Sequence, residues 1–312
     1  MNRQENRPLR VGTRGSPLAL AQAHQVRDQL ALAHAALAER GVEIVVIHTS
    51  GDRIQDRPLS DVGGKGLFTK EIEDALIAGA IDLAVHSMKD VPTLLPDGLI
   101  IASLLPREDP RDAFVAPRFD RVADLPSGAT VGTSSLRRRA LLLHARSDLR
   151  VVEFRGNVDT RLRKLREGVA DATLLAVAGL RRLGLGRGRF TALDPDEMLP
   201  AVAQGAIGIE CRAGDENTLA LLAGLHHEPT ATCVDAERSF LASLDGSCRT
   251  PIAALAQIVG GQLHFRGTIV TPDGTRLLTT TRQGALPDGA RLGADAGLEL
   301  RRKGGPDFFK TA

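Results

Sequence analysis

The sequence contains no tryptophan, no tyrosine and only three cysteines, and each shortage narrows what the chain can be. Proteins that bind single-stranded nucleic acid stack bases on aromatic rings, and here only nine Phe are available. Three widely spaced cysteines, Cys211, Cys233 and Cys248, argue against a disulfide framework and a zinc site. No apolar run approaches the roughly 18 residues that span a bilayer, and the polar N-terminus has no secretory signal. We therefore expect a cytoplasmic protein with no metal, no membrane and no nucleic acid among its partners.

Lysine is scarce as well, with six residues against 34 arginines, and the positive charge is concentrated in one stretch. Residues 134–182 hold eleven arginines and one lysine against five acidic residues, a formal charge of +7 in a chain of net +2. Several of these arginines lie where a strand is predicted to pass into a helix. Because the planar guanidinium matches carboxylate or phosphate, and helix N-termini add backbone donors, the stretch predicts a site for an anion with several negative groups. The alternative is a solvated basic face.

The 312 residues, 43% of them hydrophobic, are enough for two or three domains. The first third alternates strands and helices: strands 9–13, 42–48 and 81–86, a helix of about 22 residues after Ser16-Pro17, a loop over 49–66, and a helix over 67–78. The second series has strands 112–116, 130–132, 149–154 and 172–176 with helices 135–145, 157–167 and 177–183, followed by a strand over 206–211. Such alternation predicts two α/β lobes with mixed sheets and ligands at the carboxyl ends of the strands.

The last part of the chain has a different pattern. A helix over 231–244 precedes strands near 252–258, 263–270 and 276–281, and a final helix covers 288–303. Helices beside a small antiparallel sheet predict a separate α+β domain. No internal repeat is visible in the sequence.

Two neighbouring residues follow the predicted strand 81–86 and are candidates for chemistry. A carboxylate at the position of Asp90 can transfer protons or stabilise a developing cation, although an Asp before Val-Pro is more often a turn or cap residue. Lys89 is equally suited to pair with Asp90 or to bind an anion. At the first strand–helix turn, Ser16 is a helix cap that can also contact an anion, and Arg14 is a candidate ligand.

The arginines of the basic stretch cannot all serve one site. Arg137, Arg138 and Arg139 are about 100° apart on a helix, so at least one of them faces solvent. Arg155 at a strand end and Arg161 on the next helix can point toward the same binding site. Cys248 lies in a Gly-Ser loop, the most exposed setting of the three cysteines, and is either reactive or structural.

Taken together, these segments resemble the porphobilinogen deaminase (hydroxymethylbilane synthase) family over nearly the whole chain. Any one motif would be weak evidence, but so many in this order are specific. The matching motifs are Thr13-Arg14-Gly15-Ser16-Pro17, Gly63-Gly64-Lys65-Gly66-Leu67-Phe68, His86-Ser87-Met88-Lys89-Asp90-Val91-Pro92, Gly132-Thr133-Ser134-Ser135-Leu136-Arg137-Arg138, Arg155-Gly156-Asn157-Val158, Gln204-Gly205 and Gly246-Ser247-Cys248-Arg249-Thr250-Pro251.

The resemblance implies two lobes similar to periplasmic binding proteins, with the active site in their cleft, and a C-terminal domain that carries the cofactor. The expected boundaries are 1–105 with 203–226 for lobe 1, 106–202 for lobe 2, and 227–312 for the C-terminal domain. The implied protein is a cytoplasmic monomer.

The implied reaction is a transfer in haem and tetrapyrrole biosynthesis. Four porphobilinogens are joined head to tail, with loss of ammonia, into hydroxymethylbilane, which passes to uroporphyrinogen III synthase. Growth begins on a dipyrromethane cofactor held by a thioether, and Cys248 matches the attachment cysteine. Asp90 matches the catalytic carboxylate, and Lys65 and Phe68 match a mobile lid. The positions that match ligands of the acetate and propionate groups are Arg14, Ser16, Lys89, Ser135, Arg137, Arg138, Arg155, Arg161 and Arg182.

Two positions depart from the family pattern. Ser247 stands where glycine is frequent, and Ala203 replaces a glycine that often precedes Gln204. The rival interpretations are a non-catalytic anion-binding protein of the same two-lobed shape, and an effector or nucleic-acid binding regulator, for which no helix-turn-helix segment is present.

Overall fold

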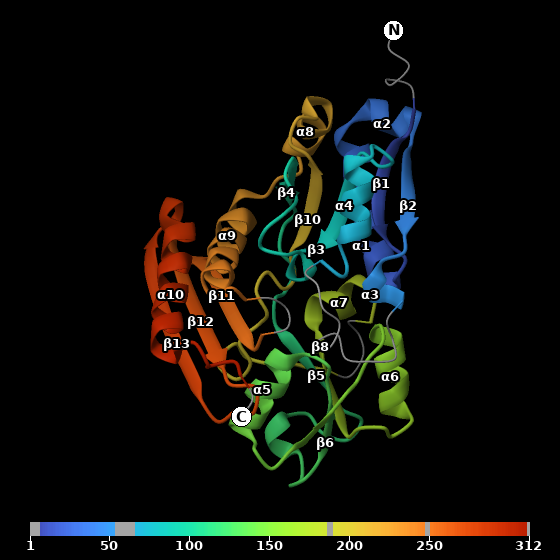
Figure 1. Ribbon diagram of the computed structural model, residues 1–312. Helices are drawn as coiled ribbons and strands as arrows, with labels where there is room; N and C mark the ends of the chain where they lie inside the picture. Colours follow the sequence, from blue (N-terminus) through green and yellow to red (C-terminus); the bar gives the residue numbers. More distant parts are fainter. Residues whose placement is uncertain (1–6, 54–65, 186–189, 247–249, 311–312) are drawn as a thin grey trace. The chain divides into compact units, whose positions relative to one another are not determined.

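The computed structural model describes residues 7–53, 66–185, 190–246 and 250–310 and divides into two compact units (Figure 1). Unit 1 comprises the chain up to Arg107 together with Ala206–Ala231. Unit 2 comprises Glu108–Gly205 and the chain from Thr232 onward. The mixed α/β class is confirmed: each unit holds one five-stranded mixed sheet, and unit 2 also holds a three-stranded sheet with helices. The three expected domain boundaries stay a prediction.

Unit 1 is built around the sheet β2-β1-β3-β10-β4. Strand β1 is parallel to β2 and β3, whereas β10 is antiparallel to β3 and β4. Helix α1 packs on one face through residues such as Val26 and Leu30, and α4 packs on the other through Ile72 and Leu76. The elements are β1 (Leu9–Arg14), α1 (Pro17–Ala33), α2 (Ala35–Arg40), β2 (Val42–Ile47), α3 (Ser50–Arg53), α4 (Lys70–Ile77), β3 (Leu83–Ser87), η2 (Met88–Asp90), β4 (Leu99–Leu104), β10 (Ile207–Arg212) and α8 (Glu216–Ala223).

Unit 2 contains the sheet β7-β6-β8-β5-β9 and the antiparallel sheet β11-β12-β13. The elements of the first part are β5 (Asp112–Val115), η3 (Val122–Asp124), β6 (Thr130–Gly132), α5 (Leu136–Ala145), β7 (Arg150–Val152), α6 (Val158–Arg166), β8 (Ala172–Ala176), α7 (Val177–Arg182) and β9 (Thr191–Ala192). The second part has α9 (Glu228–Ser243), whose first turn falls in unit 1, and then β11 (Ile252–Val259), β12 (Gln262–Val270), β13 (Leu277–Ala285), η4 (Leu286–Asp288) and α10 (Gly289–Gly304).

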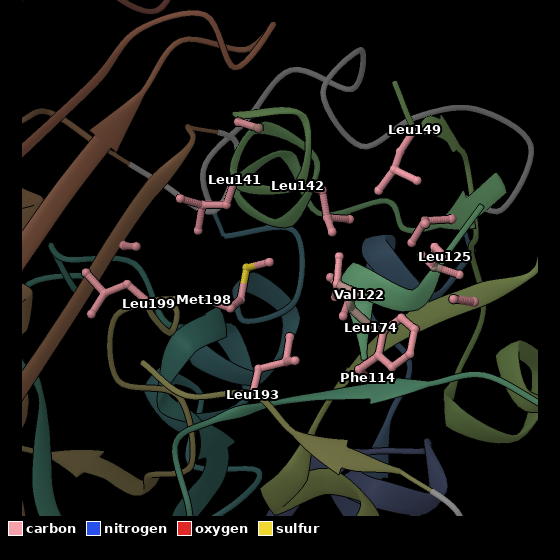
Figure 2. Packing of buried hydrophobic residues seen from close by; sticks show 14 of the residues in the cluster. Phe114, Val122, Leu125, Leu141, Leu142, Leu149, Leu174, Leu193, Met198 and Leu199 are labelled. Atoms are coloured by element: carbon pink, nitrogen blue, oxygen red, sulfur yellow. The ribbon is translucent and has the colours of Figure 1, made fainter. Parts of the chain in front are cut away.

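One hydrophobic cluster joins both sheets of unit 2. Leu141 and Leu142 of α5 lie with Phe114 of β5 and Leu174 of β8, as Figure 2 shows. Leu255 of β11 and Val270 of β12 belong to the same cluster. Beside the small sheet, α10 packs directly on α9, because a Cβ at Gly293 would lie 1.9 Å from the Ala236 carbonyl oxygen. Unit 2 therefore has a continuous core across the two sheets.

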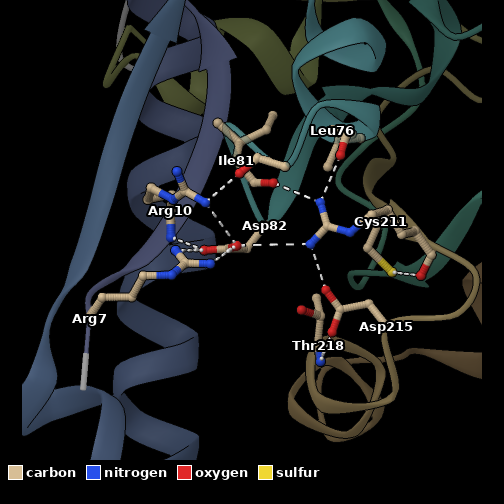
Figure 3. A network of polar contacts seen from close by, with 10 residues as sticks. Arg7, Arg10, Leu76, Ile81, Asp82, Cys211, Asp215 and Thr218 are labelled. Atoms are coloured by element: carbon tan, nitrogen blue, oxygen red, sulfur yellow. Dashed lines mark hydrogen bonds and ion pairs between the residues drawn. The ribbon is translucent and has the colours of Figure 1, made fainter. Parts of the chain in front are cut away.

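The two five-stranded sheets share one pattern of strand directions. In each, three parallel strands (β2-β1-β3 or β7-β6-β8) are followed by an antiparallel strand (β10 or β5) and by an edge strand antiparallel to that one (β4 or β9). In unit 1, the Asp82 carboxylate accepts from the Arg10 backbone N–H at 2.9 Å, and the Asp82 N–H donates to the Arg10 carbonyl at 2.9 Å. In unit 2, Asp171 makes the same two bonds with Thr130, at 2.9 and 2.8 Å. Figure 3 shows Asp82 also bound by both terminal nitrogens of Arg7. The two units thus share one sheet architecture, although no internal repeat is visible in the sequence.

Several expected elements differ in the structure. The predicted 22-residue helix is broken at His34, which leaves helical geometry (φ −133°, ψ 102°) while its ring nitrogen bonds the Leu221 carbonyl at 2.8 Å. Short helix α3 lies within the expected loop 49–66, and neither β4 nor α8 was expected. No helix in the described part of the chain is long and apolar enough to cross a membrane.

Candidate active site

In unit 1, the predicted site residues follow two neighbouring parallel strands. Arg14 ends β1, and Asp90 ends the turn η2 directly after β3. Since β1 and β3 are parallel, their carboxyl ends meet at one edge of the sheet, which is where α/β proteins bind ligands. The strand topology therefore places Arg14, Lys89 and Asp90, each a candidate from the sequence, at one edge of the sheet.

Asp90 is half-buried at this edge, and the described part of the chain gives its carboxylate neither a hydrogen-bond donor nor a salt-bridge partner. The preceding residues are held firmly. The Ser87 hydroxyl and the Gln22 side-chain amide of α1 are hydrogen-bonded, with Gln22 Nε2 2.8 Å from Ser87 Oγ. The Met88 N–H donates to the Ala206 carbonyl at 3.0 Å, next to β10. The turn thus presents an open carboxylate on a fixed backbone.

The first strand–helix turn presents Arg14 beside an aromatic ring. The guanidinium carbon of Arg14 lies 4.1 Å from the centroid of the Phe68 ring, a cation–π contact. Phe68 itself packs at Gly51, where an added Cβ would be 2.3 Å from the ring. Ser16 caps α1 by accepting from the Ala19 N–H at 3.3 Å, as expected. Lys65, the other predicted lid residue, lies outside the described residues.

In unit 2, Arg137 and Arg138 point into the protein. Their side chains are 5% and 6% exposed and enclose Asp112, which is wholly buried. Arg138 donates Nε and Nη2 to Asp112 Oδ1 at 3.1 and 2.7 Å, and Arg137 Nη1 lies 2.7 Å from Oδ2. Burial alone would raise the pKa of Asp112, but the two guanidinium charges outweigh it and hold that pKa far below its usual range.

The same two arginines also bind backbone. Arg137 Nη1 donates to the Leu199 carbonyl and Arg138 Nη1 to the Leu174 carbonyl, both at 2.7 Å. Gln204 Nε2 completes the cluster by donating to Asp112 Oδ1 at 3.0 Å. Arg139 is exposed, in agreement with the expectation that one of the three faces solvent. The role of Asp112 as the partner of both arginines was not predicted, because nothing near it in the sequence identifies partners that are distant along the chain.

The remaining predicted ligands of unit 2 lie after β7 and on α6 and α7. Arg155 is half-buried after β7, and Arg161 Nε donates to the Gly156 carbonyl at 2.9 Å. Arg182 donates Nη2 to the Gly205 carbonyl at 2.7 Å, and its burial lowers its pKa from the ordinary value. Ser135 caps α5 by accepting from the Arg138 N–H at 3.4 Å. Ser135 and Arg155 therefore follow the carboxyl ends of the parallel strands β6 and β7, and Arg161 bonds the backbone directly after Arg155.

Two other arginines of the basic stretch make specific contacts. Arg146 is half-buried, pairs with Asp148 at 2.7 Å and donates Nη2 to the Leu125 carbonyl at 3.0 Å. Arg181 is exposed but pairs with Glu108 at 2.8 Å. Cys248 lies outside the described residues, whereas Cys211 and Cys233 are buried and form no disulfide within the described part of the chain. Among the described residues, no group of His, Cys, Asp and Glu has the arrangement that holds a metal ion.

Comparison with known proteins decides the family. The model "Porphobilinogen deaminase, dipyromethane cofactor binding domain" matches residues 9–220, and "Porphobilinogen deaminase, C-terminal domain" matches residues 231–302. The chain belongs to the porphobilinogen deaminase family. Its activity is that of a transferase of tetrapyrrole biosynthesis that carries a dipyrromethane cofactor.

The relatives cover nearly the full length. The porphobilinogen deaminase of Paracoccus denitrificans is 59% identical over 302 residues, 97% of this chain and 96% of that protein. The chloroplastic porphobilinogen deaminase of Oryza sativa is 56% identical over 307 residues, 97% of this chain and 86% of that protein. Among solved structures, the periplasmic aliphatic sulphonate binding protein SsuA of Escherichia coli covers 95% of this chain with a TM-score of 0.42 and 16% identity.

Proposed function

We propose that this chain joins four porphobilinogen molecules head to tail and that Asp90 is its catalytic carboxylate. Loss of ammonia from the substrate leaves a cation conjugated to the pyrrole nitrogen. A carboxylate that is half-buried and has no partner in the described structure can accept the pyrrole N–H and stabilise that charge, since electrostatic stabilisation is strongest where water is partly excluded. The open Asp90 carboxylate on a fixed turn is the observation that carries this proposal.

We assign the acetate and propionate groups of substrate and cofactor to cationic side chains at the two sheet edges. Arg14 and Lys89 serve in unit 1, and Arg155 and Arg161 in unit 2. Ser16 and Ser135 begin helices whose first N–H groups can add donors. Each charge-assisted hydrogen bond of this kind contributes about 1.5–3 kcal/mol.

Arg137, Arg138 and Arg182 take a different part in this proposal. Their guanidinium groups hold Asp112, Leu199, Leu174 and Gly205, so we assign them first to fixing the turn after β6 and the segment before β10. Any contact of theirs with a ligand carboxylate uses the donors that remain on the same guanidinium groups.

The dipyrromethane cofactor fits this arrangement because it carries several carboxylates and each unit offers cationic side chains at one sheet edge. When bound, it supplies the carbon to which the first substrate is joined. We propose Cys248 as its thioether attachment point, with Lys65 and Phe68 as part of the lid. The Phe68 ring also makes a cation–π contact with the Arg14 guanidinium.

The attachment proposal is tested by intact mass spectrometry of the purified full-length protein. We expect an excess equal to one dipyrromethane unit, mapped to Cys248 and missing in Cys248→Ala. The matched control is Cys233→Ala, a buried cysteine that should keep the excess mass. A bare mass for the wild-type protein, made in cells that produce porphobilinogen, would overturn the proposal.

The catalytic role of Asp90 is tested with Asp90→Asn, which removes the charge and keeps the shape. We expect this holoenzyme to bind porphobilinogen but to release ammonia at least 100-fold more slowly, because general acid–base groups contribute about 10²–10⁴-fold. The control is Asp97→Asn. Asp97 is an exposed residue in the connection between β3 and β4, and this variant should release ammonia at the wild-type rate. Normal ammonia release by Asp90→Asn would remove Asp90 from the mechanism.

We further propose that the protein acts as a cytoplasmic monomer and that its product passes to uroporphyrinogen III synthase. The family resemblance supports both statements. Light scattering on the eluted protein should give a mass near the 33.2 kDa of one chain, and a doubled mass would contradict the monomer.

A further inference from the structure

A buried contact between a histidine and a glutamate lies four residues before Asp90. His86 Nε2 of β3 is 2.9 Å from Glu210 Oε2 of β10, and the two side chains are 4% and 0% exposed. The strands pair antiparallel here, with His86 opposite Gly208 and Ala84 opposite Glu210. The pair therefore links β3 to β10 by side chains at the place where their backbones already pair.

A third titratable group from α4 faces the same side of the sheet. Ala84, which shares a face with His86 by strand alternation, packs against Ile72 and Leu76 of α4. Glu73 on this helix is buried, and its burial, together with the charge of Glu210, raises the pKa of its carboxyl group. His86, Glu73 and Glu210 thus form one polar cluster inside an otherwise apolar layer.

This cluster is costly to the fold. Glu73 Oε1 and Glu210 Oε1 are buried without a hydrogen-bond partner in the described structure. An unsatisfied buried oxygen costs free energy, and apolar residues of similar volume are often as stable as a buried ion pair or more so. Packing of α4 on the sheet does not by itself require charged residues at these positions. The pair therefore calls for a functional explanation.

The backbone between His86 and Asp90 has little freedom. Met88 packs on Gly208, the register partner of His86, so closely that a Cβ at Gly208 would lie 2.0 Å from Met88 Sδ. Ser87, on the opposite face, is hydrogen-bonded to Gln22 of α1. A shift of His86 relative to β10 would therefore move Met88 and, with it, the turn that carries Asp90.

We propose that His86 and Glu210 are positioning residues that fix the end of β3 on β10 and so set the place of the Asp90 carboxylate before substrate binds. This inference rests on the proposed catalytic role of Asp90. Loss of the His86–Glu210 pair should lower turnover more than substrate binding, because the pair contacts β3 and β10 and not the cationic side chains assigned to the ligand carboxylates.

The test replaces both side chains together, so that neither is left buried without its partner. The holoenzyme His86→Leu/Glu210→Met should keep its urea midpoint within error or exceed that of the wild type. We expect kcat for ammonia release to fall at least 10-fold, KM to change less than twofold, and the cofactor mass to be retained. In the conservative variant Glu210→Gln, which keeps an acceptor for His86, kcat should lie between that of the wild type and that of the double variant.

Leu99→Ala is the matched structural control, because Leu99 belongs to the hydrophobic cluster under α4 but begins β4, away from Asp90 in the sequence. It should lower the urea midpoint and leave kcat unchanged. Wild-type kcat in the double variant, or a kcat that falls in Leu99→Ala as well, overturns the inference. If the double variant does not fold, wild-type kcat in Glu210→Gln overturns it.

Asp90→Asn is measured alongside these variants to separate the two proposals. An active Asp90→Asn refutes the catalytic role of Asp90 itself. An inactive Asp90→Asn beside a fully active double variant refutes only the positioning role of His86 and Glu210.

Discussion

Replacing Asp112 by alanine should destabilise unit 2 strongly. The carboxylate receives Nε and Nη2 of Arg138, Nη1 of Arg137 and Nε2 of Gln204, all within 3.1 Å. Its removal leaves two guanidinium groups, 5% and 6% exposed, without their counter-charge. Removing one partner of a buried ion pair costs about 3–5 kcal/mol, a large share of the roughly 5–15 kcal/mol that stabilises a typical protein.

Urea unfolding followed by circular dichroism measures this loss. With a denaturant slope of about 1–3 kcal/mol per molar, the midpoint should fall by about 1 M or more. The folded-state pKa of Asp112 is depressed, so its contribution is complete above its ordinary pKa and is lost only as the pH falls through the folded value. The loss in Asp112→Ala should therefore be the same at pH 6 and pH 8.

The control for this measurement is Asp124→Ala. Asp124 also pairs with an arginine, Arg121 at 2.8 Å, but the pair is largely solvent-exposed. Its removal should leave the midpoint unchanged, because exposed pairs contribute little. An equal midpoint for Asp112→Ala and the wild type would refute the view that Arg137 and Arg138 are held by Asp112.

Two further predictions concern other buried groups. Burial raises the folded-state pKa of Glu73, so the wild-type protein should lose stability as the pH rises from 4 through that pKa. The gain in stability from Glu73→Gln, measured as the shift in urea midpoint, should therefore be larger at pH 8 than at pH 5. A gain in stability that does not change with pH would contradict the raised pKa of Glu73. Burial raises the pKa of Cys211 to about 11, so at pH 8 the thiol is not ionised to the reactive thiolate. Iodoacetamide at pH 8 should therefore leave Cys211 unmodified in the folded protein and label it only after denaturation. Peptide mass mapping measures this labelling.

Elements whose signals are local were predicted well from the sequence. Ser16 and Pro17 begin α1 as expected, and Asn157 caps α6 by accepting from the Thr160 N–H. The end of α1 was placed too late because the break at His34 depends on the Leu221 carbonyl, 187 residues away in the sequence. The pairing of Arg137 and Arg138 with Asp112 was not predicted either, because Asp112 is about 25 residues earlier and has the pattern of an ordinary strand residue.

The family motifs carried the site prediction further than residue patterns alone. Asp90 was singled out because it follows a predicted strand, and the parallel pairing of β1 with β3 brings the ends of both strands to one sheet edge. The His86–Glu210 pair could not be predicted, because it depends on β10 lying beside β3 after an excursion of more than 100 residues. The burial of these two side chains depends on that strand pairing, which no local pattern in the sequence predicts.

The position of β10 has a consequence for folding during synthesis. This strand lies between β3 and β4, so β4 has no neighbour in its sheet until residues 207–212 have been made. In contrast, every strand of the sheet β7-β6-β8-β5-β9 lies between residues 112 and 192. Because closing long-range strand pairs is slow and domains fold as units during synthesis, the N-terminal sheet should be completed after the one that follows it. Until then, the nascent chain exposes a strand edge that a chaperone could protect.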